Sequence, residues 1–130
     1  MPDLTSRGIW IGRVLSFLPA LFLLVDGAMK LAKPAFVVEA TVQLGYPERV
    51  IVGIGVVLLA CTLLYLAPRT AVLGAILLTG YLGGAVATHV RVGTGLFNIL
   101  FPVILGALLW GGLALRDPRV AALLAPAPNR

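Results

Sequence analysis

The chain has 130 residues, of which 60% are hydrophobic and 12% are charged. Soluble domains average about 45–50% apolar and about 25% charged residues, so this composition excludes an ordinary soluble domain and indicates a membrane protein. The net charge of +5 would fit nucleic-acid binding in a soluble chain. Here the basic residues stand singly at the ends of apolar runs, where charges set the topology of membrane segments. We therefore expect no nucleic-acid partner and a lipid bilayer around a single domain, residues 1–130.

Four apolar segments approach the roughly 20 residues that a helix needs to cross a bilayer. The predicted helices span residues 9–31, 50–66, 71–90 and 96–115. Only Pro68, Arg69 and Thr70 separate the second helix from the third, so these two must be antiparallel neighbours. The sequence therefore predicts an all-α fold, an integral membrane antiparallel four-helix transmembrane bundle.

Two shorter segments are not predicted to cross the membrane. Residues 35–44 set Glu39 and Gln43 against apolar neighbours, which predicts a short amphipathic helix lying at the interface between the first two spans. Gly45, Tyr46 and Pro47 then break the chain. After the fourth helix, residues 117–130 end in Ala, Pro and polar residues, which predicts a frayed tail.

The charges predict how the bundle is oriented. Four crossings place both termini on one side, together with six of the ten Lys and Arg residues: Arg7, Arg13, Arg69, Arg116, Arg119 and Arg130. The other side has Lys30, Lys33, Arg49 and Arg91. Because cytoplasmic loops carry an excess of Lys and Arg, both termini are predicted to be cytoplasmic.

Polar residues gather at the other end of the predicted bundle. Ionisable residues within a span cost about 2.5–3.5 kcal/mol each at its centre on insertion scales, so they tend to face inward and pair. Asp26 and Lys30 are four apart on one helix and can pair, and Tyr81 and Thr88, seven apart, share a face. A polar-ended pocket would collect the candidate ligand-binding residues Asp26, Lys30, Glu39, Tyr81, Thr88, His89, Arg91 and Asn98.

A structural interpretation of these residues is equally open. In it, Asp26 and Lys30 only satisfy each other, while His89 and Arg91 mark the membrane interface. No metal site is expected, because the chain has one cysteine, Cys61, and one histidine. A single cysteine also excludes an internal disulfide.

The glycines of the third helix predict close packing. Gly80 and Gly84 have the GxxxG spacing that lets helix backbones approach, and Gly83 lies beside them. We expect this surface to pack helices within one bundle. Dimerisation through it, giving a homo-oligomer, is the alternative.

Three motifs follow one another along the chain. Gly27-Ala28-Met29-Lys30-Leu31 precedes Pro34, Gly45-Tyr46-Pro47 precedes the second span, and GYLGGAVATHVRVG ends the third. Together they resemble the DoxX-like family of small bacterial membrane proteins, over roughly residues 9–117. The resemblance implies a multi-pass four-helix bundle in the bacterial inner membrane. The family is named after a subunit of a thiosulfate:quinone oxidoreductase, and some relatives are linked to oxidative-stress complexes. It supplies no agreed catalytic residues, so none are assigned.

Three interpretations of function follow. The first is an accessory or quinone-interacting membrane subunit of a redox system, in which His89 or Tyr81 would hydrogen-bond a quinone carbonyl and the Asp26–Lys30 pair would orient the ligand or relay protons. The second is a non-catalytic binding or carrier module for a small lipophilic molecule in the same pocket. The third is a structural partner or chaperone of another membrane or redox protein. A bound quinone would favour the first and a co-purifying protein the third.

Overall fold

The computed structural model describes residues 2–127, and the side chains of residues 6–127. Four long helices dominate it: α1 (Pro2–Ala32), α3 (Ile51–Leu66), α4 (Ala71–Val92) and α5 (Leu96–Arg116). Four helical segments of the described chain are long and apolar enough to cross a membrane, and they are Ser6–Ala32, Glu48–Leu66, Ala71–Val92 and Leu96–Arg116. The second combines α3 with the three residues before it. Large hydrophobic side chains are exposed along all four helices, as expected for surfaces that face lipid. The prediction of an all-α four-helix bundle is confirmed.

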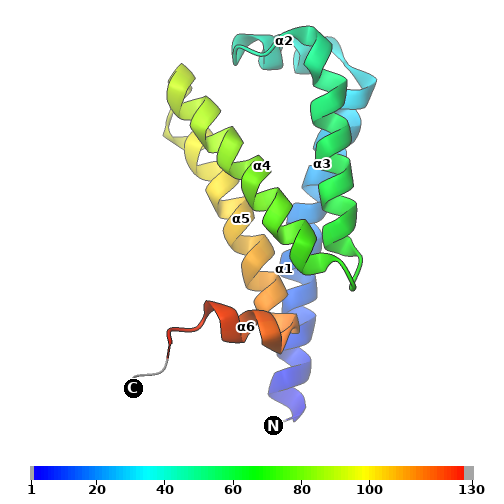
Figure 1. Ribbon diagram of the computed structural model, residues 1–130, viewed down its shortest axis with the longest axis vertical. Helices are drawn as coiled ribbons and strands as arrows, with labels where there is room; N and C mark the ends of the chain where they lie inside the picture. The colour runs from blue at the N-terminus through cyan, green and yellow to red at the C-terminus, as the bar shows by residue number, and fades with distance from the viewer. Residues whose placement is uncertain (1, 128–130) are drawn as a thin grey trace.

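The four helices form two pairs that open like a V (Figure 1). α1 packs along α3 and α4 packs along α5, while α1 also contacts α5 and α3 contacts α4. The pairs meet at the end that holds both termini and diverge toward the opposite end (Figure 1). Across that opposite end lies the short α2 (Ala35–Gln43), followed by the 3₁₀ turn η1 (Glu48–Val50). α2 occupies the segment where an interfacial helix was predicted.

Close contacts at small residues explain where the helices touch. A Cβ added to Gly12 would lie 2.6 Å from the Gly112 carbonyl oxygen, so α1 and α5 approach through these glycines near the termini. A Cβ added to Gly55 would lie 3.0 Å from the Gly27 carbonyl oxygen, which fixes α1 against α3 near the α2 end. Gly74 packs directly against the backbone of Tyr65, which holds α4 to α3 at their turn.

The glycines predicted to pack helices behave differently. A Cβ added to Gly80, Gly83 or Gly84 would meet no atom within 4 Å outside its own helix backbone. Contrary to our expectation, these three glycines therefore make no close helix contact within the chain. The GxxxG spacing shows only that two glycines share a helix face, and this face of α4 is turned away from the neighbouring backbones.

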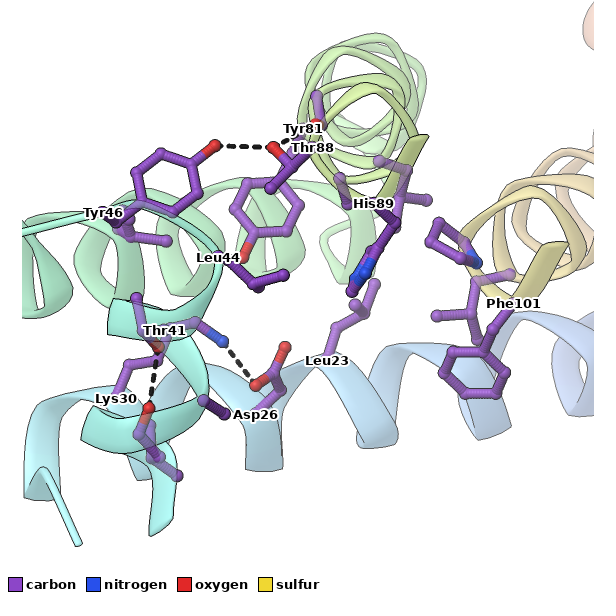
Figure 2. Close-up of a pocket in the computed structure, with 18 of the residues that line it drawn as sticks. Leu23, Asp26, Lys30, Thr41, Leu44, Tyr46, Tyr81, Thr88, His89 and Phe101 are labelled. Carbon is purple, nitrogen blue, oxygen red and sulfur yellow. Dashed lines mark hydrogen bonds and ion pairs between the residues drawn. The ribbon is translucent and has the colours of Figure 1, made fainter. Parts of the chain in front are cut away.

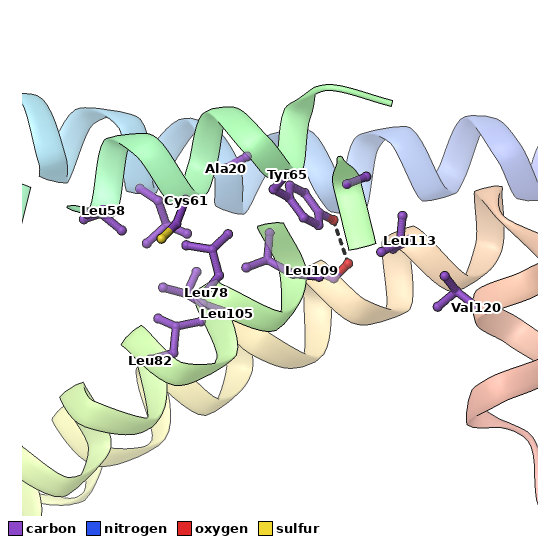
Figure 3. Packing of buried hydrophobic residues seen from close by; sticks show 13 residues of the cluster. Ala20, Leu58, Cys61, Tyr65, Leu78, Leu82, Leu105, Leu109, Leu113 and Val120 are labelled. Atoms are coloured by element: carbon purple, nitrogen blue, oxygen red, sulfur yellow. Dashed lines mark hydrogen bonds between the residues drawn. The ribbon is translucent and has the colours of Figure 1, made fainter. Parts of the chain in front are cut away.

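The buried core lies where the two helix pairs meet (Figure 3). Tyr65 is fully buried, and its hydroxyl oxygen lies 2.6 Å from the Leu109 carbonyl oxygen of α5 and 2.8 Å from Ser16 Oγ of α1. Arg116 donates from Nε to Ser16 at 3.1 Å, and its guanidinium carbon lies 5.4 Å from the centre of the Tyr65 ring. One tyrosine of α3 thus binds both α1 and α5.

The C-terminal segment differs from the frayed tail predicted for residues 117–130. Its first part forms α6 (Pro118–Leu124), and Val120 of this helix is buried in the core. Asp117 caps α6 by accepting from the Arg119 backbone N–H at 3.0 Å. The Arg119 side chain also donates to Asp117, and this hydrogen bonding lowers the pKa of that carboxyl group. Transmembrane length and hydropathy do not predict a helix of seven residues, so neither the cap nor the buried valine was expected. Residues 128–130 of the predicted tail lie outside the described part.

Adjacent glycines of α5 provide a test of this packing. Gly112 leaves no room for a Cβ beside Ser16 and the Gly12 carbonyl, whereas a Cβ on Gly111 would meet nothing within 4 Å outside its own helix backbone. We expect Gly112→Leu to lower the free energy of unfolding by about 1–3 kcal/mol or more, the usual cost of overpacking. Gly111→Leu should leave it nearly unchanged. Thermal unfolding of both variants in the same detergent checks this, and equal stability of the two would show that α1 and α5 do not pack at Gly112.

Candidate ligand-binding pocket

A cavity of about 600 Å³ lies at the end of the bundle where the helix pairs diverge, beneath α2 (Figure 2). Residues from α1, α2, α3, α4 and α5 line it, so every helix except α6 contributes. This volume is in the range of pockets that hold small organic ligands. The cavity therefore exists because the helix pairs are held together at one end and open at the other.

Most of the cavity wall is apolar. Leu23 is buried on α1, and Pro102 and Leu105 are buried on α5. Phe22 and Phe101 meet edge to face with ring centroids 5.1 Å apart, which joins α1 to α5 at this part of the wall. A ligand in the cavity would thus have aliphatic and aromatic neighbours over most of its surface.

An ion pair on α1 forms part of the polar side of the cavity. Lys30 Nζ lies 2.6 Å from Asp26 Oδ1, and both residues line the cavity (Figure 2). The Lys30 side chain is 14% exposed and that of Asp26 is 34% exposed. The predicted pairing is therefore present in the structure. The two opposite charges leave this side of the cavity without net charge.

Three polar residues of α4 complete the polar side: Tyr81, Thr88 and His89. Thr88 donates to the Gly84 carbonyl oxygen at 2.8 Å and lies 2.7 Å from the Tyr46 hydroxyl. Because the Thr88 proton is used within its own helix, Tyr46 is the donor in the second bond. His89 Nδ1 lies 2.7 Å from Thr94 Oγ1, which orients the imidazole ring.

Two groups on this side have no partner among the described residues. The Tyr81 hydroxyl makes no hydrogen bond there, and His89 uses only Nδ1, so its Nε2 is unpaired. Both side chains line the cavity between α1 and α4 (Figure 2). A hydroxyl and an imidazole nitrogen are thus available to a ligand on one side of an otherwise apolar space.

The structure brings together five of the eight candidate residues and not the other three. Asp26, Lys30, Tyr81, Thr88 and His89 line the cavity. Glu39 is exposed on α2. Arg91 donates to the Leu44 carbonyl oxygen at 3.2 Å, and Asn98 donates to the carbonyl oxygen of Thr94, four residues earlier, at 3.1 Å. These three were included because they belong to the right end of the bundle, but their positions on the helices turn them away from the cavity.

Several lining residues were not predicted. Tyr46 follows α2 and reaches Thr88, which is 42 residues away in the sequence. Its place between two chain-breaking residues, Gly45 and Pro47, was the available signal. Gly80 and Gly84 also line the cavity, where the absence of side chains leaves space rather than bringing helices together.

Four apolar helices, a lipid-facing exterior and a cavity within the bundle define a multi-pass membrane protein. A comparison with protein families identifies the kind of membrane protein, because the model of the DoxX-like family matches residues 14–112. This chain belongs to the DoxX-like family. No curated protein and no solved structure matched the chain.

The Asp26–Lys30 pair can be tested by a double-mutant cycle. Removing one partner of a buried pair costs up to about 3–5 kcal/mol, whereas replacing both by apolar residues is often neutral. We expect Asp26→Leu and Lys30→Met each to destabilise the protein, by less than this because a third of the Asp26 side chain is exposed. The double variant should recover most of the loss. Thermal unfolding in nanodiscs measures the cycle, and additive losses would show that the two charges do not depend on each other.

Proposed function

We propose that this protein binds a small lipophilic molecule in the cavity, and that it does so as an accessory, quinone-interacting membrane subunit of a redox system. The observation that carries the proposal is the pair of unpaired groups, the Tyr81 hydroxyl and His89 Nε2, on one side of an apolar cavity of about 600 Å³. Pockets of this kind bind ligands by apolar contact and orient them by a few polar groups.

The chemistry of the cavity favours an uncharged ligand with hydrogen-bond acceptors. Asp26 and Lys30 cancel each other's charge, so a charged ligand would gain no counter-ion without breaking their 2.6 Å bond. Tyr81 can donate to a carbonyl oxygen, and His89 can donate from Nε2 when Nδ1 accepts from Thr94. A quinone ring has carbonyl acceptors and an apolar remainder, which matches both parts of the wall.

A carrier function would use the same contacts. The same wall residues would contact a ligand whether the ligand is then reduced, oxidised or passed on, so binding is the part of the proposal that the geometry supports directly. In the redox interpretation the electrons come from a partner protein, and this chain supplies the binding groups.

Binding can be measured with a short-chain quinone. We expect purified protein in nanodiscs to bind decylubiquinone, and Tyr81→Phe or His89→Phe to raise its Kd by about two- to tenfold, the effect of one lost neutral hydrogen bond. Equilibrium dialysis of the labelled quinone gives the Kd of each variant. Thermal unfolding in parallel should show little change, since neither group has a partner within the described protein.

Two neighbouring glycines supply a matched control. Gly84 lines the cavity and Gly83 does not, while both have open space where a Cβ would lie. Gly84→Leu should fill part of the cavity and abolish quinone binding, whereas Gly83→Leu should bind as the unaltered protein does. Equal binding by both variants, or no binding by the unaltered protein, would refute the proposed site.

We further propose that the protein lies in the bacterial inner membrane with both termini in the cytoplasm. The described chain begins and ends at the narrow end of the bundle (Figure 1), and five of its nine Lys and Arg residues belong to that end. The cavity would then open in the outer half of the membrane. A reporter fused after Arg119 should be active only if it is a cytoplasmic marker; activity of a periplasmic marker there would reverse the orientation.

A further inference from the structure

The segment over the cavity is bounded by two unusual backbone positions. Lys33, just after α1, has φ of 55°, and Gly45, just after α2, has φ of 95°. Left-handed φ is uncommon for a residue with a side chain, so Lys33 marks a sharp break in the chain. Pro34 follows the end of α1 and Pro47 follows the end of α2, and a proline prevents a helix from continuing through its position. Residues 34–47 are thus a separate unit between two chain reversals.

This segment packs weakly on the rest of the bundle. The helices that approach the α2 backbone closely are α1 and η1, and Thr41 is its one buried residue. Phe36 is 60% exposed although it also lines the cavity. An ion pair of 3.3 Å between Lys33 and Glu48 ties together the two ends of the segment. The segment is therefore held at its base and covers the cavity with its apolar side.

Two hydrogen bonds attach the C-terminal end of this segment to α4, across the opening between the helix pairs. The Tyr46 hydroxyl donates to Thr88 Oγ1 at 2.7 Å (Figure 2). Arg91 Nη2 donates to the Leu44 carbonyl oxygen at 3.2 Å. Leu44 and Tyr46 themselves line the cavity. Both attachments thus join the cover to the opposite wall of the cavity.

We propose that residues 34–47 are a movable cover over one side of the cavity, that the Tyr46–Thr88 and Arg91–Leu44 hydrogen bonds hold it against α4 and so narrow the opening of the cavity, and that its displacement widens that opening for the ligand. The chain bends at Lys33 and at Gly45, and the two hydrogen bonds are made by Tyr46 and Leu44 on either side of the second bend, so they hold that bend against α4. This inference rests on the proposed binding function only for the passage of ligand; the opening itself is a property of the chain. One neutral hydrogen bond contributes little net stability, so its loss should raise the rate of opening without unfolding the bundle.

A thiol placed inside the cavity reports opening without any ligand. Ala85 lines the cavity, and Ala85→Cys in a Cys61→Ala background supplies a single reactive group there. We expect a small water-soluble methanethiosulfonate reagent to modify this cysteine about two- to tenfold faster when Tyr46→Phe or Thr88→Val is added, the ratio that corresponds to one hydrogen bond. Combining both changes should give no more than the larger single effect, because they remove the same bond.

Two controls separate opening of the cover from general loosening. Glu39→Gln changes an exposed residue of α2 outside the cavity, so it should leave the Ala85→Cys rate unchanged. A cysteine at Val92, exposed at the end of α4, should react at the same rate with and without Tyr46→Phe. An Ala85→Cys rate unaffected by both Tyr46→Phe and Thr88→Val would overturn the cover, as would equal acceleration at Val92.

The same variants distinguish failure of the cover from failure of the proposed function. If decylubiquinone does not bind but the thiol rates change as expected, the proposed ligand is wrong and the cover stands. When quinone does bind, Arg91→Met, which removes the attachment made from outside the cavity, should speed association and dissociation alike and leave Kd within about twofold. A rise in the dissociation rate alone would overturn the role of Arg91 in holding the cover.

Discussion

The buried Tyr65 hydroxyl is the interaction on which the arrangement of the helices depends. The Tyr65 hydroxyl can donate its proton to the Leu109 carbonyl oxygen or to Ser16 Oγ, and Ser16 Oγ also accepts from Arg116. These hydrogen bonds join α1, α3 and α5. Unpaired polar groups are costly in the apolar interior of a membrane, so the network fixes one arrangement of the three helices. Gly74 of α4 packs directly against the backbone of Tyr65, so α4 is attached at the same place.

The open end of the bundle follows from where these attachments are placed. Tyr65, Gly74 and the Gly12–Gly112 approach all lie toward the end of the termini, whereas the Gly27–Gly55 approach joins only α1 to α3 at the other end. No comparable glycine contact within residues 2–127 ties α4 to its neighbours there, and Gly80 and Gly84 leave room where larger residues would fill it. The rigid end allows the helices to separate at the other without loss of the fold, and the space between them is the cavity.

The sequence predicted the spans well because transmembrane length and hydropathy are local properties, and it predicted five cavity residues because helix ends that share a face of the bundle must be close. It could not show which side of each helix faces inward. The GxxxG pattern on α4 therefore predicts a packing surface where the structure has open space, and the position of Arg91 predicts a pocket residue although its side chain bonds to Leu44 outside the cavity. Tyr46 was missed for another reason. Its bond to Thr88 depends on how the chain turns at Gly45, and a turn between two helices has no periodic pattern from which its direction could be inferred.

The polar groups of the two ends differ in a way that bears on function. At the narrow end, Tyr65, Ser16 and Arg116 satisfy one another, and Thr62 and Thr79 return their protons to carbonyls of their own helices. No fully buried side-chain polar atom among the described residues lacks a partner. The Tyr81 hydroxyl and His89 Nε2 are unpaired, and both belong to residues that line the cavity. A molecule bound in the cavity would bring acceptors to these two groups, and each hydrogen bond gained there would contribute to its affinity. A ligand that supplies the acceptors would therefore stabilise the folded chain in proportion to its affinity, which couples occupancy of the cavity to the stability of the less firmly held end of the bundle.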